Sequence, residues 1–258
     1  MAESPTLAPR PLHGRRVVVT RPAGQSAHLQ QLLNDAGAAT VELPLLQLVG
    51  LPCPPATGTA AAPPDWVIAV SPSAVRFGQD WWAGPWPPAC RVAGVGAGTA
   101  RAWREAGHAA PLQPEAGQDS AALLEAPDLQ AVTGQRIIIV RGEGGRDLLG
   151  PALRARGAVV DEWLCYRREP PPTLAADLQR LCQSPPAVDA WTLTSSEAVA
   201  HLDAAWPPDM PRTAPVFAPH PRIIEAARDA GWMTVLTPEG DSGLLAGLRT
   251  WFDDGHHD

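Results

Sequence analysis

The chain has 258 residues, 45% of them hydrophobic and 18% charged, which predicts a globular protein of one large domain or, as we favour, two ordinary ones. All 20 basic residues are arginines, which excludes chemistry that needs a Schiff-base lysine or the lysine of an ATP-binding P-loop. The formal net charge of −7 disfavours a nucleic-acid-binding protein, because such proteins normally carry a basic face.

Residues 1–14 lack the apolar core of a signal peptide, so we expect a disordered leader. No apolar run approaches the length of a transmembrane helix, and we therefore expect a cytoplasmic protein with no membrane partner. The four cysteines show no CxxC spacing, which argues against a metal site and against a disulfide framework. They are Cys53, Cys90, Cys165 and Cys182.

Residues 16–43 form the first predicted unit. The valine run at 17–19 indicates a strand, and a glycine-containing loop follows it. Leucines at helical spacing then predict a helix that ends at Gly37. The segment 38–43 is a second strand.

The second predicted unit follows a Pro/Ala-rich connection at residues 51–64. The run WVIAV predicts a strand, after which the turn SPS leads into a helix near Ala74. A further strand, RVAGVG, leads through Gly98 to a helix that stops at Gly107. We expect Ser120 or Asp119 to cap one more short helix.

Residues 136–170 form the most complete predicted unit. The β-branched run IIIV is typical of a strand buried on both faces of a parallel sheet. The loop RGEGGR follows, then a helix that we expect to begin at Asp147 and to end at Gly157. A second strand runs to Tyr166. A glycine loop before a helix N-terminus can bind an anion, although a tight turn alone also explains the glycines.

The chain carries an internal repeat. Arg141 lies 120 residues after Arg21, and Gly157 lies 120 residues after Gly37. The segment LTSSEAV also resembles the earlier VSPSAVR. Strands that alternate with helices predict parallel sheets covered on both faces, with ligands at the carboxyl ends of the strands. The pattern leaves two groupings open. Either each consecutive pair of units is a domain, or the middle two units form one domain and the ends form the other.

The segments VVVTRPAGQ, SPSAV, VGAGTA, VRGEGGRDLL, LCYRR, LTSSEAV and APHPRIIEAA, taken in this order, resemble the uroporphyrinogen-III synthase family over about residues 15–248. The resemblance implies an α/β protein of two flavodoxin-like parallel-sheet domains joined by a two-stranded linker. A discontinuous domain would comprise residues 1–46 and 170–258, and an inserted domain residues 47–169.

The resemblance also implies a function. The family cyclises hydroxymethylbilane, a linear tetrapyrrole with eight carboxylates, to uroporphyrinogen III, with inversion of ring D and loss of water in the cleft between two domains. This would make the chain a cyclising hydro-lyase of heme biosynthesis that uses no cofactor or metal, and a monomer. The loop APHPR, with His220 and Arg222, departs from the small polar turn that is usual in the family.

Tyr166 is the only tyrosine, and it matches the family residue favoured to assist departure of the hydroxyl. Since the strand before it ends at the carboxyl edge of the sheet and the chain then crosses to the other domain, we expect its phenol to project near the mouth between the two domains and to donate a hydrogen bond there. Glycine turns, hydroxyl groups and arginines suit a polycarboxylate. The candidate substrate-binding residues are Thr20, Arg21, Ser71, Ser73, Gly96, Thr99, Arg141, Gly144, Gly145, Arg146, Ser195, Ser196 and His220.

Each candidate also has a purely structural interpretation. Tyr166 can be a packing aromatic. Arg141 and Arg146 can be paired with Glu143 and Asp147. Several hydroxyl residues are natural helix N-caps: Ser71, Ser73, Thr99, Ser195 and Ser196. The alternative function is a non-catalytic two-domain binding protein for an anionic small molecule, since a fold does not fix a function.

Overall fold

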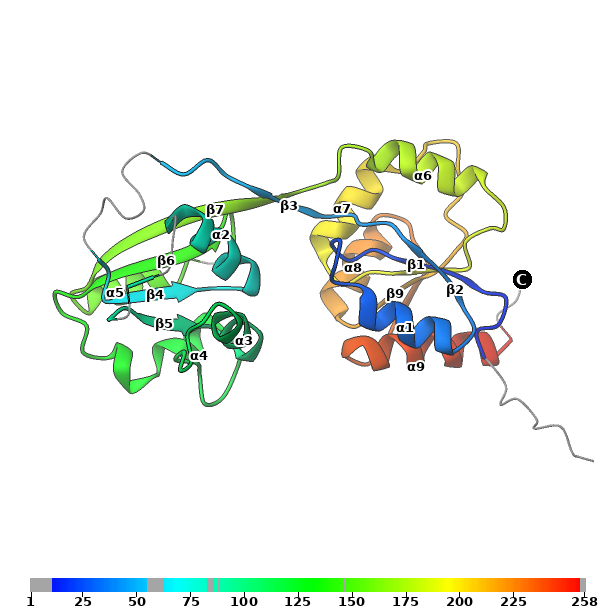
Figure 1. Cartoon of the computed structure of the whole chain (residues 1–258). Helices are drawn as coiled ribbons and strands as arrows, with labels where there is room; N and C mark the ends of the chain where they lie inside the picture. Colours follow the sequence, from blue (N-terminus) through cyan, green and yellow to red (C-terminus); the bar gives the residue numbers. More distant parts are fainter. Residues whose placement is uncertain (1–10, 55–62, 83–85, 88, 146, 256–258) are drawn as a thin grey trace, which may run out of the picture. The chain divides into compact units, whose positions relative to one another are not determined.

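The computed structural model describes residues 11–54, 63–82, 86–87, 89–145 and 147–255 (Figure 1). The chain forms two compact units. Unit 1 is Met1–Gln47 with Glu169–Asp258, and unit 2 is Leu48–Arg168. The middle of the chain therefore makes one unit and the two ends make the other.

The end of the expected leader is ordered. Residues 1–10 lie outside the described residues, as does much of the Pro/Ala connection. Leu12, however, is fully buried, and its N–H donates to the carbonyl of Ala36 at 3.1 Å. The expectation of a disordered leader is wrong for residues 11–14, because Leu12 belongs to the hydrophobic core that contains Leu29 and Leu33.

Unit 1 contains a parallel five-stranded sheet in the order β10-β9-β8-β1-β2. Its strands are β1 (Arg16–Val19), β2 (Ala39–Glu42), β8 (Ala190–Thr192), β9 (Val216–Ala218) and β10 (Thr234–Leu236). In chain order this arrangement reads 2-1-3-4-5, the order of flavodoxin-like folds. Its helices are α1 (Ala27–Asp35), α6 (Leu174–Gln183), α7 (Ser196–Ala205), α8 (Pro221–Asp229) and α9 (Gly240–Asp253).

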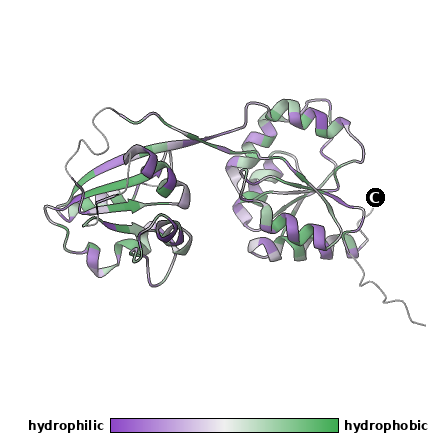
Figure 2. Ribbon diagram, viewed as in Figure 1, coloured by the Kyte–Doolittle hydropathy of each residue, from purple (hydrophilic) through white to green (hydrophobic). Residues whose placement is uncertain are grey.

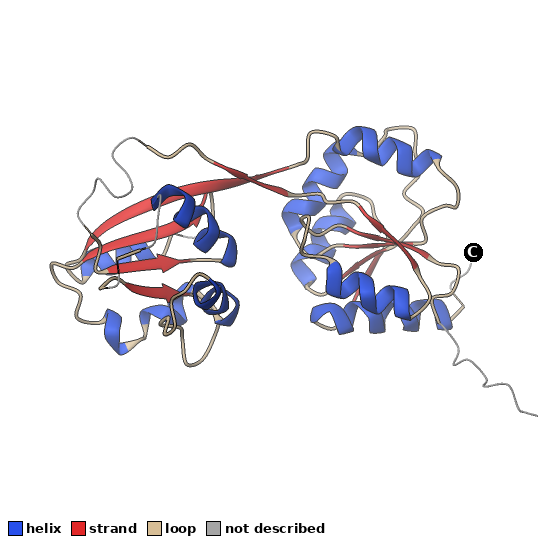
Figure 3. Cartoon of the chain, in the orientation of Figure 1, coloured by secondary structure: helices blue, strands red, loops and turns tan. Residues whose placement is uncertain are grey.

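The helices of unit 1 cover both faces of the sheet (Figure 3). Val18 packs in a core with residues of α6, α7 and α8, whereas Val17 and Val19 pack in a second core with residues of α1 and α9. This division follows from the alternation of side chains along a strand. Burial of each such side chain contributes roughly 1.5–3 kcal/mol, and Figure 2 shows the hydrophobic residues gathered on the strands.

Unit 2 contains the sheet β3-β7-β6-β4-β5. Its strands are β3 (Gln47–Gly50), β4 (Trp66–Ala69), β5 (Arg91–Gly94), β6 (Arg136–Gly142) and β7 (Val159–Glu169). Residues of α2 and α3 pack on one face, and those of α4 and α5 on the other. The helical segments are α2 (Pro72–Trp82), α3 (Ala97–Glu105), α4 (Ser120–Leu124), the 3-10 turn η2 (Pro127–Leu129) and α5 (Leu149–Ala155).

The internal repeat is visible in the sheets. The order β5-β4-β6-β7 in unit 2 corresponds to β9-β8-β1-β2 in unit 1. The counterpart of β10 is reduced to Leu112, which makes one isolated parallel bridge with Ala93. The prediction of repeated α/β units with parallel sheets is confirmed.

Two adjacent strands carry the chain from one unit to the other. The unit boundaries fall within β3 and β7, which are neighbours in the sheet. The amide of Gln47 donates to the carboxylate of Glu169 at 3.1 Å, and the N–H of Leu51 donates to the carbonyl of Cys165 at 2.9 Å. These contacts show that β3 and β7 run in opposite directions, and the predicted two-stranded linker is confirmed.

The structure differs from the predictions, or decides between them, at three local features. The helix expected to begin at Asp147 begins at Leu149, because the Asp147 carboxylate lies beside Arg141 instead of capping the helix. Not every strand is followed by a helix, since β3 follows β2. Of the two caps considered for α4, Asp119 is the one used, and it accepts from the N–H of Ala122 at 2.9 Å.

Candidate functional site

Ser71 and Tyr166 meet at the carboxyl edge of the sheet in unit 2. Ser71 lies two residues after the end of β4, and Tyr166 lies near the end of β7. Their hydroxyl oxygens are 2.9 Å apart. The Ser71 oxygen also accepts from the N–H of Ala74 at 3.0 Å, so Ser71 caps the N-terminus of α2.

The ring of Tyr166 is buried, with 2% of its surface exposed. It stacks on Phe77, with ring centroids 5.1 Å apart, and it covers Gly142. A bulge explains this orientation. Arg141 pairs with Leu164 but Gly142 pairs with Tyr166, which leaves Cys165 as the extra residue. The packing interpretation of Tyr166 therefore describes its ring, while its hydroxyl reaches Ser71.

Arg141 is held by groups of its own unit. Its Nη2 donates to the carbonyl of Gly144 at 2.7 Å, and its Nη1 lies 3.4 Å from Asp147 and 3.5 Å from Glu162. Only 12% of the Arg141 side chain is exposed. Arg141 is thus ion-paired with Asp147, as the structural interpretation of the sequence held. Glu162 is a further partner that the sequence did not indicate.

The glycine loop turns carbonyl groups toward this arginine. Gly144 and Gly145 have φ of 74° and 82°, the left-handed conformation that glycine adopts without strain. The carbonyl of Gly145 lies 3.5 Å from Arg141 Nη2. The loop therefore supports Arg141. Arg146 lies outside the described residues.

The start of α3 lies beside the start of α2. Gly96 is the N-cap of α3 and offers no side-chain cap. A Cβ added to Gly98 would lie 3.8 Å from Pro72, in ordinary contact. Ser73 is half-buried in the first turn of α2. Thr99 lies inside α3 with 3% exposure, so the expectation that it caps the helix is wrong.

In unit 1, Thr20 and Arg21 follow β1. Thr20 is 2% exposed, and its hydroxyl donates to the carbonyl of Thr192 at 2.7 Å, which ties two neighbouring strands together. Arg21 lies 2.5 Å from one oxygen of Asp241, and His28 lies 2.7 Å from the other. Burial alone would raise the pKa of Asp241, but the hydrogen bonds of His28 and Arg21 and the charge of Arg21 outweigh it and lower the pKa.

The starts of α7 and α8 also lie together in unit 1. Ser195 caps α7 and accepts from the N–H groups of Glu197 and Ala198. His220 caps α8, because its Nδ1 accepts from the N–H of Arg222 at 3.1 Å. The hydroxyl of Ser196 donates to the carbonyl of Arg222 at 3.5 Å. The capping interpretation is correct for Ser195 and extends to His220.

Two partners in these clusters were missed from the sequence. Glu162 lies within β7 and faces Arg141, and Asp241 lies in the first turn of α9 and faces Arg21. An acidic residue in the first turn of a helix is common and carries no specific signal. Phe77, which supports the ring of Tyr166, looked like an ordinary apolar position of α2.

The comparisons with known proteins agree with these features. A family model described as uroporphyrinogen-III synthase HemD matches residues 27–242. The chain belongs to the uroporphyrinogen-III synthase family. The resemblance drawn from the ordered motifs is therefore confirmed, and the family is one of enzymes of heme biosynthesis that act on a tetrapyrrole substrate.

Relatives in this family come from several bacteria. The uroporphyrinogen-III synthase of Proteus mirabilis is 31% identical over 159 residues, which cover 59% of this chain and 79% of that protein. That of Synechococcus elongatus is 34% identical over 180 residues, 66% of this chain and 67% of that protein. For the Escherichia coli enzyme, 34% identical, the matched region spans 64% of its length, less than two thirds.

Solved structures of the family share the fold. A mutant uroporphyrinogen III synthase from Thermus thermophilus has a TM-score of 0.53 and 21% identity, with 93% of this chain and all of that chain covered. The uroporphyrinogen-III synthetase of Helicobacter pylori has a TM-score of 0.58 and 11% identity, with 90% and 96% covered. The predicted α/β fold is thereby confirmed.

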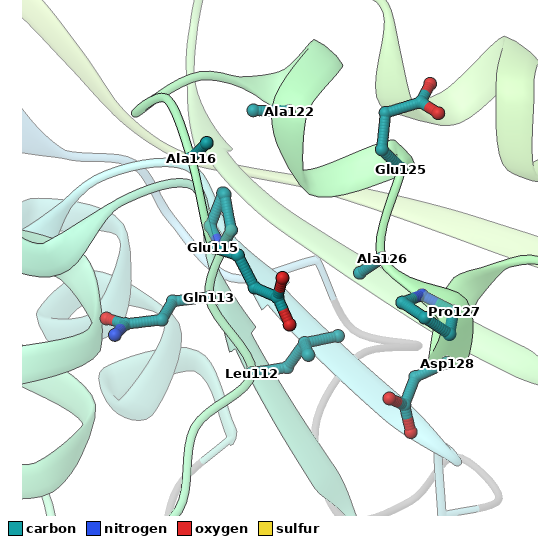
Figure 4. A pocket seen from close by; sticks show the side chains of 10 residues that line it. Leu112, Gln113, Glu115, Ala116, Ala122, Glu125, Ala126, Pro127 and Asp128 are labelled. Carbon is teal, nitrogen blue, oxygen red and sulfur yellow. The ribbon is translucent and has the colours of Figure 1, made fainter.

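A cavity of about 580 Å³ in unit 2 is lined by residues between Leu112 and Asp128 (Figure 4). Three carboxylates lie among its lining residues, those of Glu115, Glu125 and Asp128. Arg91 offsets one of them, 3.6 Å from Asp128. No sequence-predicted site residue lines this cavity. Its acidic lining does not suit the polycarboxylate substrate implied by the family resemblance.

Among the residues that the structure describes, no group of three or more histidine, cysteine, aspartate or glutamate side chains is arranged to hold a metal ion. No helix among those residues has the length and apolar character needed to span a membrane. The cysteines are free thiols, and Cys90 and Cys165 are buried.

Proposed function

We propose that this chain cyclises hydroxymethylbilane to uroporphyrinogen III, with inversion of ring D and loss of water. The match of residues 27–242 to the uroporphyrinogen-III synthase family carries this proposal. The polar groups at the carboxyl edge of each sheet agree with it, because that edge is where open α/β sheets bind ligands.

The proposed reaction needs no redox partner. The C–O bond of the terminal hydroxymethyl group breaks, the electron pair leaves with oxygen, and a proton completes the water molecule. The remaining azafulvene cation is attacked by the substituted carbon of ring D, and a spiro intermediate rearranges. Since the reaction loses only water and is redox-neutral overall, we assign a cofactor-independent, cyclising hydro-lyase. We also propose that it acts as a monomer, which sedimentation at assay concentration tests.

Several groups are proposed to bind the substrate carboxylates. In unit 2 the paired starts of α2 and α3 present Ser73 and the uncapped backbone near Gly96. In unit 1 Ser196 and His220 occupy the equivalent place at the starts of α7 and α8, and Arg21 follows β1, the strand next to β8. Positive helix ends and an arginine favour an anion.

Other candidates take indirect roles in this proposal. Thr20 and Thr99 are buried, so we assign them to shaping the strand and helix ends. Arg141, Gly144 and Gly145 form a loop whose polar groups bind one another, and substrate carboxylates would compete with Glu162 and Asp147 for Arg141. Tyr166 and Ser71, whose hydroxyls are joined by a hydrogen bond, act together on the departing hydroxyl.

Incubation with freshly generated hydroxymethylbilane tests the function. The bilane closes spontaneously to the uninverted type I isomer, so the isomers are separated by chromatography. We expect the type III isomer, in equal amount with and without a chelator. Type I alone would contradict the enzymatic assignment, and type I together with saturable binding of the bilane would indicate a binding protein.

A further inference from the structure

We propose that the Ser71 hydroxyl is the group that touches the departing hydroxyl of the substrate, and that Tyr166 lies behind it and supplies a proton through it. The inference rests on the proposed function and reassigns the contacting group within that site. It follows from the burial of the phenol, from the hydrogen bonds of both hydroxyls and from the helix that begins at Ser71.

Burial separates the two hydroxyls. Tyr166 is 2% exposed, and its ring is enclosed by Phe77 on one side and by Gly142 on another. Ser71 is only partly buried and is followed by the exposed Pro72. A ligand that approaches this edge of unit 2 therefore meets the serine first.

The phenol has one way to satisfy its proton. Within the described part of the chain, the Tyr166 hydroxyl has Ser71 as its one hydrogen-bond partner. If Ser71 donated to Tyr166, the buried phenol proton would have no acceptor there, which is costly. The phenol is also the more acidic of the two hydroxyls. Tyr166 therefore donates to Ser71.

The serine oxygen is then fully used as an acceptor. It has two lone pairs, and these accept from the phenol of Tyr166 and from the N–H of Ala74. The remaining polar function of Ser71 is its own O–H. Since neither Tyr166 nor Ala74 takes that proton, it is available to a ligand at the exposed side of the residue.

This arrangement makes Ser71 a stronger donor than an isolated serine. Two donors polarise its oxygen in the same sense, and hydrogen bonds in such a chain strengthen one another. Ser71 also caps the positive end of α2, a helix of 11 residues, where developing negative charge is stabilised.

The proton balance uses both residues. As the C–O bond of the substrate breaks with its electron pair on oxygen, the Ser71 proton passes to that oxygen and water leaves. The phenol proton of Tyr166 follows to Ser71, which leaves a phenolate. When the ring D carbon that forms the final bond loses its proton, that proton returns to Tyr166 through Ser71. No other reactant is consumed.

Four variants test the assignment by steady-state formation of the type III isomer. We expect Ser71→Ala to lower kcat by about 100-fold or more with little change in KM, the range for one acid–base group. Ser71→Thr keeps the hydroxyl and should recover most of the loss. Tyr166→Phe should lower kcat less, by about 10-fold, and the double variant should be no slower than Ser71→Ala.

Asp119→Ala is the matched control, because it also removes a helix cap in unit 2 but lies at α4. Its kcat should equal that of the wild type. Circular dichroism establishes which variants fold. If Ser71→Ala does not fold, the kcat values of Ser71→Thr and Tyr166→Phe still test which hydroxyl touches the substrate. Full kcat in Ser71→Ala, no recovery in Ser71→Thr, or a Tyr166→Phe defect larger than that of Ser71→Ala would each overturn the inference. Wild-type protein that forms no type III isomer would instead refute the proposed function.

Discussion

The ring of Tyr166 lies directly against the backbone of Gly142. A Cβ placed on Gly142 would sit 2.6 Å from Cε2 and 2.7 Å from Cζ of that ring, closer than real Cβ atoms approach other atoms. The bulge between β6 and β7 creates this contact, since it places Gly142 opposite Tyr166. Glycine is thus required here for space, and the position of the phenol depends on it.

We expect Gly142→Ala to destabilise the protein by about 1–3 kcal/mol, the usual cost of overpacking a core. The ring of Tyr166 must move away, and its hydrogen bond with Ser71 is then lost. Turnover should therefore fall at least as far as in Tyr166→Phe. Urea unfolding and the isomer assay measure the two effects.

Gly98→Ala provides the stability control, because its added methyl would meet Pro72 at an ordinary 3.8 Å and lies within α3. Alanine is the better helix former by about 0.5–1 kcal/mol. This variant should be neutral or slightly more stable. An equal loss of stability in both variants would refute the packing argument for Gly142.

Asp241 should make the stability of unit 1 depend on pH in acid. Its folded pKa is lowered, so its contribution is present above the unfolded pKa and is lost as the pH falls through the folded pKa. Only 13% of its side chain is exposed, but His28 is 71% exposed, so we expect about 0.5–1 kcal/mol.

The comparison with Asp241→Asn tests this prediction. At neutral pH the wild type should have the larger free energy of unfolding. The difference should shrink as the pH falls below about 4, where this carboxylate begins to bind a proton in the unfolded chain. Denaturant titrations at several pH values measure it, and a difference that grows in acid would have the wrong sign.

The strands were predictable where burial on both faces leaves a continuous apolar run. The valines of β1 and the isoleucines of β6 are of this kind, and the predicted start of β1 agrees with Arg16–Val19. The helix caps at Ser71 and Ser195 were also predictable, because a serine that follows a strand and precedes a helix has a local reason to be there.

The site could be predicted only in part, because its contacts depend on register and on strand order. One extra residue in β7 turns the side chain of Tyr166 into the core, and no local pattern marks this bulge. Asp241 meets Arg21 through the fold of unit 1, although the two are far apart in sequence. Sequence patterns thus located the sheet edges and the nearby partner Asp147 of Arg141, but not the partners that are distant in sequence.

The cysteines should differ in reactivity. Burial, assisted by the charge of Asp65, raises the pKa of Cys90 to about 11, and burial also raises the pKa of Cys165. Cys53 is exposed. Since the thiolate is the reactive form, iodoacetamide at mildly alkaline pH should label Cys53 first and leave Cys90 and Cys165 unmodified until the protein unfolds. Peptide mass spectrometry follows each site, and early labelling of Cys165 would contradict its burial.

Arg141 should matter to stability as much as to substrate binding. Its guanidinium joins the carbonyl of Gly144 to the carboxylates of Asp147 and Glu162 while only 12% of the side chain is exposed. Removal of the guanidinium leaves these groups without a shared donor, so we expect Arg141→Ala to cost about 1–3 kcal/mol in urea unfolding. Arg141→Lys keeps the charge but loses the planar guanidinium group. Its free energy of unfolding should therefore lie between those of the wild type and Arg141→Ala.

Arg101→Ala is the matched control for Arg141→Ala, since the pair of Arg101 with Glu105 is 3.8 Å long and its side chains are 75% and 71% exposed. A surface pair of this kind is worth less than about 1 kcal/mol, so this variant should unfold almost as the wild type does. The Michaelis constant for the bilane separates the two roles of Arg141. If Arg141→Ala is as stable as Arg101→Ala and only its KM rises, the residue serves the substrate alone, and its contacts with Glu162 and Asp147 contribute nothing to folding.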